Sequence, residues 1–136
     1  MKATHVLIIQ TGPAGRTLVQ SFLQPFGFEQ GEHYMFLTGF DVHTLGIIEK
    51  DVPQLIFTSH CEECDATLVA RMVKDYNPQA IVLALTTRQI SAAEWPELDG
   101  VIDKREIGRD QLAVIVDTFR KGASRDQLKK VVAEFV

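Results

Sequence analysis

The sequence has few of the features that mark secreted, membrane-bound or nucleic-acid-binding proteins. Its 136 residues contain only two cysteines, Cys61 and Cys64, which are too few for a secreted disulfide framework and fit a reducing compartment. No basic run occurs and the formal net charge is -4, so nothing indicates a direct nucleic-acid partner. The first apolar run, Val6 to Ile9, is too short for a signal-peptide core or a membrane span. We therefore expect a cytoplasmic protein that contacts neither nucleic acid nor membrane.

The composition is that of an ordinary globular domain. Hydrophobic residues make up 46% of the chain and charged residues 24%, which excludes disorder for most of it. A chain of 136 residues forms one domain that is stable without disulfides or metal. We find no repeat, low-complexity tract or internal linker.

Short apolar runs alternate with stretches of helical spacing along the chain. The runs predict buried strands because they lack the alternation of a half-exposed strand, and they are Val6–Ile9, Tyr34–Leu37, Leu55–Phe57, Ala80–Leu85 and Gly100–Lys104. The helical stretches are 14–26, 42–48, 68–76, 90–98 and 112–119. Strands that alternate with helices pair in parallel through right-handed crossovers, which predicts a three-layer α/β sandwich.

A sixth helix is predicted beyond this repeating pattern. Ser124 and Gln127 resemble a capping box, and an apolar stripe follows at Leu128, Val131, Val132 and Phe135. We therefore divide the chain into a domain at 1–122 and an additional amphipathic helix at 123–136. The stripe must be covered, either by the helix's own domain or by a partner or linker contact.

The stretch Pro53 to Ser59 is predicted to be the central strand. Loops that leave the carboxyl ends of central parallel strands form the functional crevice of such sheets. We therefore expect Ser59 and the residues that follow it to lie at the functional site.

These elements resemble those of receiver domains, the CheY-like response-regulator domains of two-component signalling. The resemblance covers about residues 5–121 and rests on element order and strand ends. It implies a flavodoxin-like fold with a five-stranded parallel sheet of order 2-1-3-4-5. In that family, two acidic residues after the first strand and an aspartate ending the third hold Mg²⁺, and that aspartate accepts a phosphoryl group.

The sequence departs from the family at the residues that carry this chemistry. Gln10 and Thr11 replace the acidic pair, and Ser59 takes the position of the phosphoryl acceptor. Thr86 and Lys104 match the remaining two positions of the pocket. Amide and hydroxyl groups are poor ligands for Mg²⁺, so the resemblance is to a degenerate receiver that lacks phosphorylation, metal and cofactor.

Two alternative site interpretations remain open. Cys61 and Cys64, with His60 beside them, have the spacing of a redox pair at a helix N-terminus or of part of a metal site. The segment 12–17, which reads GPAGRT, resembles weakly a phosphate loop or the FMN-phosphate loop of flavodoxins. Neither forms a complete catalytic or cofactor-binding set.

We therefore expect a non-catalytic signalling or protein-interaction module whose partner is a signalling protein or an effector domain. In the receiver family, the surface that corresponds to residues 89–121 mediates output and dimerisation. Homodimerisation is a second candidate, since tryptophan is enriched in interface anchors. The predicted interface residues are Trp95, Leu112, Ile115, Phe119 and Phe135.

Overall fold

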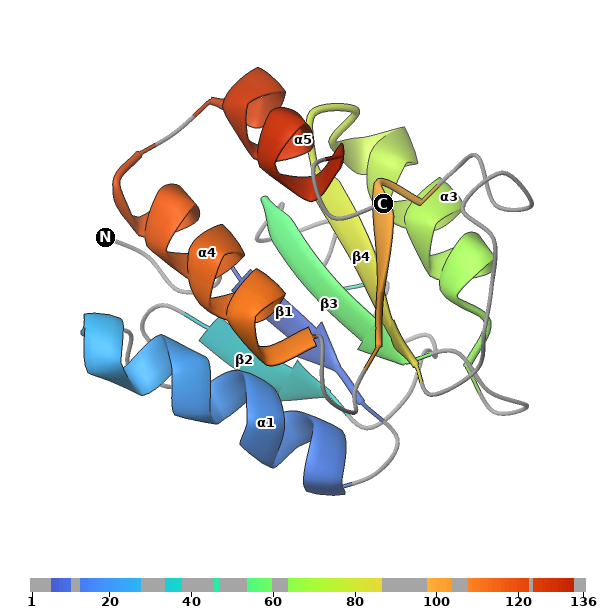
Figure 1. Cartoon of the computed structure of the whole chain (residues 1–136). Coiled ribbons are helices and arrows are strands. Elements are labelled where there is room, and N and C mark those ends of the chain that lie inside the picture. The colour runs from blue at the N-terminus through green and yellow to red at the C-terminus, as the bar shows by residue number, and fades with distance from the viewer. Residues whose placement is uncertain are drawn as a thin grey trace.

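The structure, a computed structural model, describes residues 6–10, 13–27, 34–37, 46, 54–59, 64–86, 98–103, 108–122 and 124–133. Its elements, drawn in Figure 1, follow one another as β1 (Val6–Ile9), α1 (Pro13–Leu23), η1 (Gln24–Phe26), β2 (Tyr34–Leu37), β3 (Leu55–Ser59), α3 (Ala66–Tyr76), β4 (Ile81–Thr86), β5 (Gly100–Asp103), α4 (Gly108–Arg120) and α5 (Arg125–Ala133). The helices expected at 42–48 and 90–98 lie outside these described residues.

The five strands form one parallel sheet of order β2-β1-β3-β4-β5. Both the predicted strand runs and the predicted order are confirmed. β2 lies on one side of β1, and β3, β4 and β5 lie on the other. The order in which strands are added to the sheet therefore changes direction at β1. Ligands of open α/β sheets bind at such a switch point, outside the carboxyl ends of the strands.

Helices cover both faces of the sheet, as Figure 1 shows. One apolar cluster joins α1, α4 and α5 to alternate strand residues such as Leu55 and Phe57. A second cluster joins α3 to the residues between them, such as Ile56. Successive side chains of a strand point to opposite faces, so β3 contributes to both cores, and all of its residues are buried. This burial confirms the prediction of a central strand.

The helix ends lie where the sequence predicts them. Gly27 follows η1 with φ +85° and Gly122 follows α4 with φ +79°, a left-handed conformation that glycine adopts without steric cost. Helix α3 ends at Tyr76, and the side chain of Asn77 accepts a hydrogen bond from Gln79 N at 3.2 Å. Pro78 follows directly, where its ring does not interrupt the helix.

The C-terminal helix α5 packs on its own domain. Leu128 and Val132 are each 3% exposed and belong to the same cluster as α1 and α4. The predicted capping box is present, because Ser124 N donates to Gln127 Oε1 at 2.9 Å and Gln127 N donates to Ser124 Oγ at 3.3 Å. The sequence left open whether the domain or a partner covers the apolar stripe. For Leu128 and Val132, the structure shows that the domain itself covers it.

Candidate functional site

The candidate site lies at the carboxyl edge of the sheet, where β1 and β3 end. Gln10 follows the last residue of β1, and Ser59 is the last residue of β3. The register pairs Ile9 with Thr58, so parallel pairing brings Gln10 and Ser59, one position further along each strand, to the same point of the edge. This point is the switch between the two halves of the sheet.

Gln10 and Ser59 form a buried hydrogen bond. Ser59 Oγ donates to Gln10 Oε1 at 3.0 Å, and the two residues are 3% and 0% exposed, respectively. The other end of the amide, Nε2, is buried and has no hydrogen-bond partner among the described residues. A buried polar atom without a partner destabilises the fold, so the hydrogen bond from Ser59 satisfies only one end of this amide.

Thr58 adds a polar residue that the sequence analysis did not single out. Its Oγ1 donates to the backbone oxygen of Ser59 at 3.0 Å and lies 3.6 Å from Cys64 Sγ. Cys64 is 2% exposed and lies in the apolar cluster beneath α3. The available signal was a hydroxyl residue directly before Ser59 in an otherwise apolar strand.

The remaining predicted site residues are only partly covered by the structure. Thr86 is the last residue of β4, where the register pairs it with Asp103 of β5. Thr11, Lys104, His60, Cys61, Trp95 and Phe135 lie outside the described residues. The structure therefore brings together Gln10 and Ser59 from the predicted pocket and places the end of β4 at the same edge.

The polar side chains described at the ends of β1 and β3 are uncharged. The amide of Gln10 and the hydroxyls of Thr58 and Ser59 carry no formal charge, whereas Mg²⁺ is held in proteins by carboxylates and phosphate oxygens. Within the described residues, no group of three or more His, Cys, Asp and Glu side chains could hold a metal ion. The donor set at Gln10 and Ser59 therefore does not fit the Mg²⁺ site of a receiver domain.

Two of the alternative features look different in the structure. Pro13 to Thr17, most of the segment that resembles a phosphate loop, forms the first part of α1, with proline at the first helical position. It is therefore helix and not an extended glycine-rich loop. Of the two cysteines, Cys64 is buried among apolar side chains, a setting typical of a structural cysteine.

The interface prediction is wrong for two residues. Leu112 and Ile115 are 0% exposed and pack against the sheet within the domain's own core. The apolar stripe of α4 is therefore buried within the domain, and neither Leu112 nor Ile115 is accessible to a partner. Phe119 is half-buried against the same cluster and stays a candidate, whereas Val114, on the outer side of α4, is 45% exposed.

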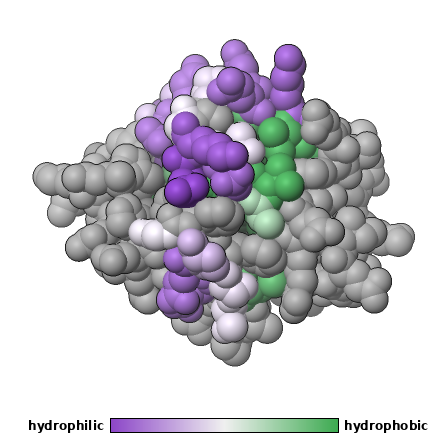
Figure 2. All heavy atoms as spheres, turned by 60° about the vertical axis from the view of Figure 1, so that its left-hand side comes forward, coloured by the Kyte–Doolittle hydropathy of each residue, from purple (hydrophilic) through white to green (hydrophobic). Residues whose placement is uncertain are grey.

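The side of the molecule shown in Figure 2 is mostly hydrophilic where it is described, with a smaller area of hydrophobic atoms beside the hydrophilic ones. None of the described helices is both long enough and apolar enough to cross a membrane.

Comparison of the fold with solved structures finds receiver domains of response regulators among its neighbours. A CheY-like response regulator receiver domain protein from Methanospirillum hungatei superposes with a TM-score of 0.65 at 15% identity, over 92% of this chain and 95% of that one. The signal receiver domain of the putative response regulator NarL from Mycobacterium tuberculosis gives 0.63 at 16% identity, over 90% and 99% of the two chains.

A third neighbour is the isolated receiver domain of RcsB from Salmonella enterica serovar Typhimurium, determined with a phosphomimetic. Its TM-score is 0.65 at 14% identity, over 90% of this chain and 96% of that one. No family model and no curated protein sequence matches the chain. At this level of identity, the comparisons establish the fold.

Proposed function

We propose that this chain, which has the fold of CheY-like receiver domains, is a phosphorylation-independent signalling or protein-interaction module. It performs no catalysis, binds no cofactor and acts in the cytoplasm by contacting a signalling protein or an effector domain. A shared fold does not by itself define a function, so the proposal rests on the chemistry of the edge where β1 and β3 end.

One observation carries the proposal, namely the buried hydrogen bond between Ser59 Oγ and Gln10 Oε1. In the receiver family the position of Ser59 holds the aspartate that accepts the phosphoryl group, and the position of Gln10 holds a Mg²⁺ ligand. Here Ser59 is 3% exposed, and its hydroxyl donates its proton to the amide oxygen of Gln10.

This pair lacks the properties that phosphoryl transfer to a receiver domain requires. A phosphoryl donor must reach the nucleophile in line, and Mg²⁺ neutralises the charge that develops on the phosphoryl oxygens. A serine hydroxyl also needs a base to activate it, and Gln10 is not one. The replacement of charged by neutral groups therefore removes both the metal and the acceptor.

The proposal is tested by incubating the chain with acetyl phosphate and Mg²⁺ and measuring its intact mass. We expect no phosphoryl adduct, and we expect no heat of Mg²⁺ binding at millimolar concentration in a calorimetric titration. An ordinary receiver domain treated in parallel shows that the reagents work. A variant with Gln10→Asp, Thr11→Asp and Ser59→Asp restores the three carboxylates and is expected to bind Mg²⁺ if it folds.

A stable adduct on the wild-type chain that disappears in Ser59→Ala would overturn the proposal. Such a result would mean that the buried hydroxyl becomes accessible and is activated by a group outside the Gln10–Ser59 pair.

Homodimerisation is a second form of the same proposal. Trp95, Phe119 and Phe135 remain its interface candidates, since Leu112 and Ile115 are buried in the core. Because phosphorylation does not switch this pocket between two states, protein concentration or partner binding sets the equilibrium between monomer and dimer.

A further inference from the structure

A buried carboxylate joins the two helical layers at the opposite edge of the sheet, where β4 and β5 begin. The side chain of Asp99, just before β5, is 2% exposed. It accepts a hydrogen bond from Val82 N at 2.8 Å, while Asp99 N donates to Val82 O at 2.9 Å. Lys74 Nζ of α3 lies 3.0 Å from Asp99 Oδ2, and Lys129 Nζ of α5 lies 3.5 Å from Oδ1.

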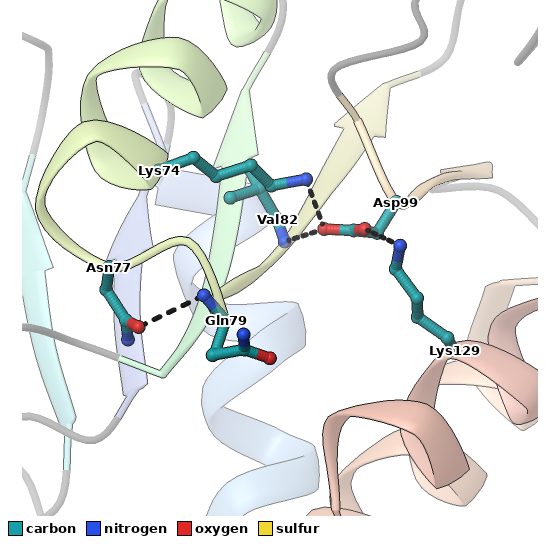
Figure 3. Close-up of polar contacts among 6 residues, drawn as sticks. All are labelled: Lys74, Asn77, Gln79, Val82, Asp99 and Lys129. Atoms are coloured by element: carbon teal, nitrogen blue, oxygen red, sulfur yellow. Dashed lines mark hydrogen bonds and ion pairs between the residues drawn. The ribbon is translucent and has the colours of Figure 1, made fainter.

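Figure 3 shows the two lysines approaching this carboxylate from different sides. Lys74 belongs to the layer of α3 and Lys129 to the layer of α1, α4 and α5. Asp99 is therefore the charged contact by which the sheet holds α5.

The residue after Asp99 provides a steric contact to the same helix. A Cβ added at Gly100 would overlap Val132 Cγ1 and would lie 3.1 Å from Leu83 Cδ2. The absence of a side chain at Gly100 thus forms a hole that Val132 fills. Asp99 and Gly100 together recognise Lys129 and Val132, which lie three positions apart on α5.

Most of the side chains described on α5 are exposed. Leu128 and Val132 are its buried side chains among the described residues, and Val131 is half-buried. Asp126, Gln127, Lys129 and Lys130 are exposed. The capping box satisfies the N-terminus of the helix internally, and Gly122, with its left-handed backbone, separates α5 from α4.

From these contacts we infer that Asp99, Gly100 and Leu83 form a helix-docking groove, which the chain's own α5 occupies reversibly as an internal ligand. The groove's partner is a short amphipathic helix of the same chemistry. It carries an apolar residue, a lysine or arginine directly after it, and a second, β-branched apolar residue four positions after the first, as in Leu128, Lys129 and Val132. The partner's cation meets Asp99 and its β-branched residue fills the hole at Gly100.

The inference extends the proposed function by naming the class of protein partner. The two fail separately, because acetyl phosphate tests the pocket at Ser59, whereas the experiments below test α5 at the other edge of the sheet.

Hydrogen exchange of the full chain tests whether α5 opens by itself. Sub-global opening exposes one element before the rest unfolds, so we expect the α5 amides, after correction for intrinsic rates, to exchange at least about tenfold faster than those of α4. Lys129→Met is expected to increase the α5 rate further and to leave α4 unchanged. Lys130→Met, which removes the same charge one residue away, is the matched control and is expected to change neither rate.

An engineered disulfide between β5 and α5 provides the complementary state, in which α5 cannot leave the sheet. A Cβ at position 100 would lie 3.9 Å from Val132 Cβ, within the range of about 3.5–4.5 Å found in disulfides. Oxidised Gly100→Cys/Val132→Cys is therefore expected to slow α5 exchange to the α4 rate, and reductant is expected to reverse the effect. Peptide mapping establishes that positions 100 and 132 are joined and that Cys61 and Cys64 are not.

Binding of a helix in trans is measured with a fluorescent, hydrocarbon-stapled peptide of residues 124–136. We expect it to bind the Lys129→Met chain, in which α5 is loosened, and not the oxidised double-cysteine chain. A peptide with Lys129→Glu places a carboxylate against Asp99 and is expected to bind at least about tenfold more weakly because the like charges repel. A tenfold loss of affinity corresponds to about 1.4 kcal/mol.

Equal exchange of α5 and α4 in the wild type, unaffected by Lys129→Met, would show that α5 is an integral part of the core and would overturn the inference. So would peptide binding that is the same for the oxidised and reduced chains, or absent from every chain.

Discussion

At the scale of single residues, the last residue of β3 forms a structural hydrogen bond with the residue that follows β1. Ser59 and Gln10 are both buried, and their bond at 3.0 Å leaves Gln10 Nε2 without a partner among the described residues. A polar pair of this kind contributes little net stability, because burial removes both groups from water. Removing one member and removing both are expected to have different effects.

We predict that Ser59→Ala destabilises the fold by about 1–2 kcal/mol, because Gln10 then has an unpaired oxygen as well as an unpaired nitrogen. The double variant Gln10→Met/Ser59→Ala is expected to recover most or all of this loss, since apolar groups of similar shape replace both partners. Urea unfolding with an unchanged m-value measures the differences. A double variant less stable than Ser59→Ala would show that the amide has further partners that stabilise it.

At the scale of elements, each described helix combines a locally specified end with a face chosen by packing. Asp65 caps α3, with Oδ1 accepting from Thr67 N at 2.9 Å. Ala66, Val69, Ala70 and Val73 face the sheet. Leu68 and Tyr76 of the same helix are 44% and 46% exposed, so two of its apolar residues stay at the surface.

We predict that Asp65→Ala destabilises the protein by about 1 kcal/mol, because it removes the side-chain cap of α3. Asp65→Asn keeps an acceptor oxygen at the same place and is expected to cost no more than a few tenths of a kcal/mol. Thermal and chemical unfolding of both variants measure this. An equal loss in the two variants would assign the effect to the charge near the helix N-terminus and not to the hydrogen bond.

At the scale of the whole molecule, the sheet separates two edges with different chemistry. The carboxyl edge holds the neutral Gln10–Ser59 pair, and the amino edge holds the charged contact of Asp99 with Lys74 and Lys129. Function in this proposal therefore depends on surfaces and not on a reaction at the pocket.

We predict a weak homodimer at micromolar concentration that depends on Trp95. Sedimentation velocity across that range is expected to show a concentration-dependent increase in the wild type and a shift towards monomer in Trp95→Ala, because tryptophan anchors are often energetic centres of interfaces. Tyr76→Ala, which removes an aromatic residue that is 46% exposed on α3, is the control and is expected to leave association unchanged. A strictly monomeric wild type, or a dimer insensitive to Trp95→Ala, would contradict this prediction.

The sequence by itself determined the described strands and helices and their arrangement in a parallel sheet. Continuous apolar runs specify strands buried on both faces, and the ends at Gly27, Asn77 and Gly122 follow from local backbone preferences. The sheet order followed from the resemblance carried by those elements. These features could be predicted from the sequence because periodicity and capping depend on residues that are close in the chain.

Only the tertiary structure decided which side chains meet. Ser59 and Gln10 are 49 positions apart, and their bond exists because the register of β1 and β3 aligns them. The same applies to Asp99, which reads as an ordinary loop residue until the sheet places it between α3 and α5, and to Leu112 and Ile115, whose stripe fits a partner as well as a core. An apolar stripe specifies that a face is covered, but the packing of the layers decides what covers it.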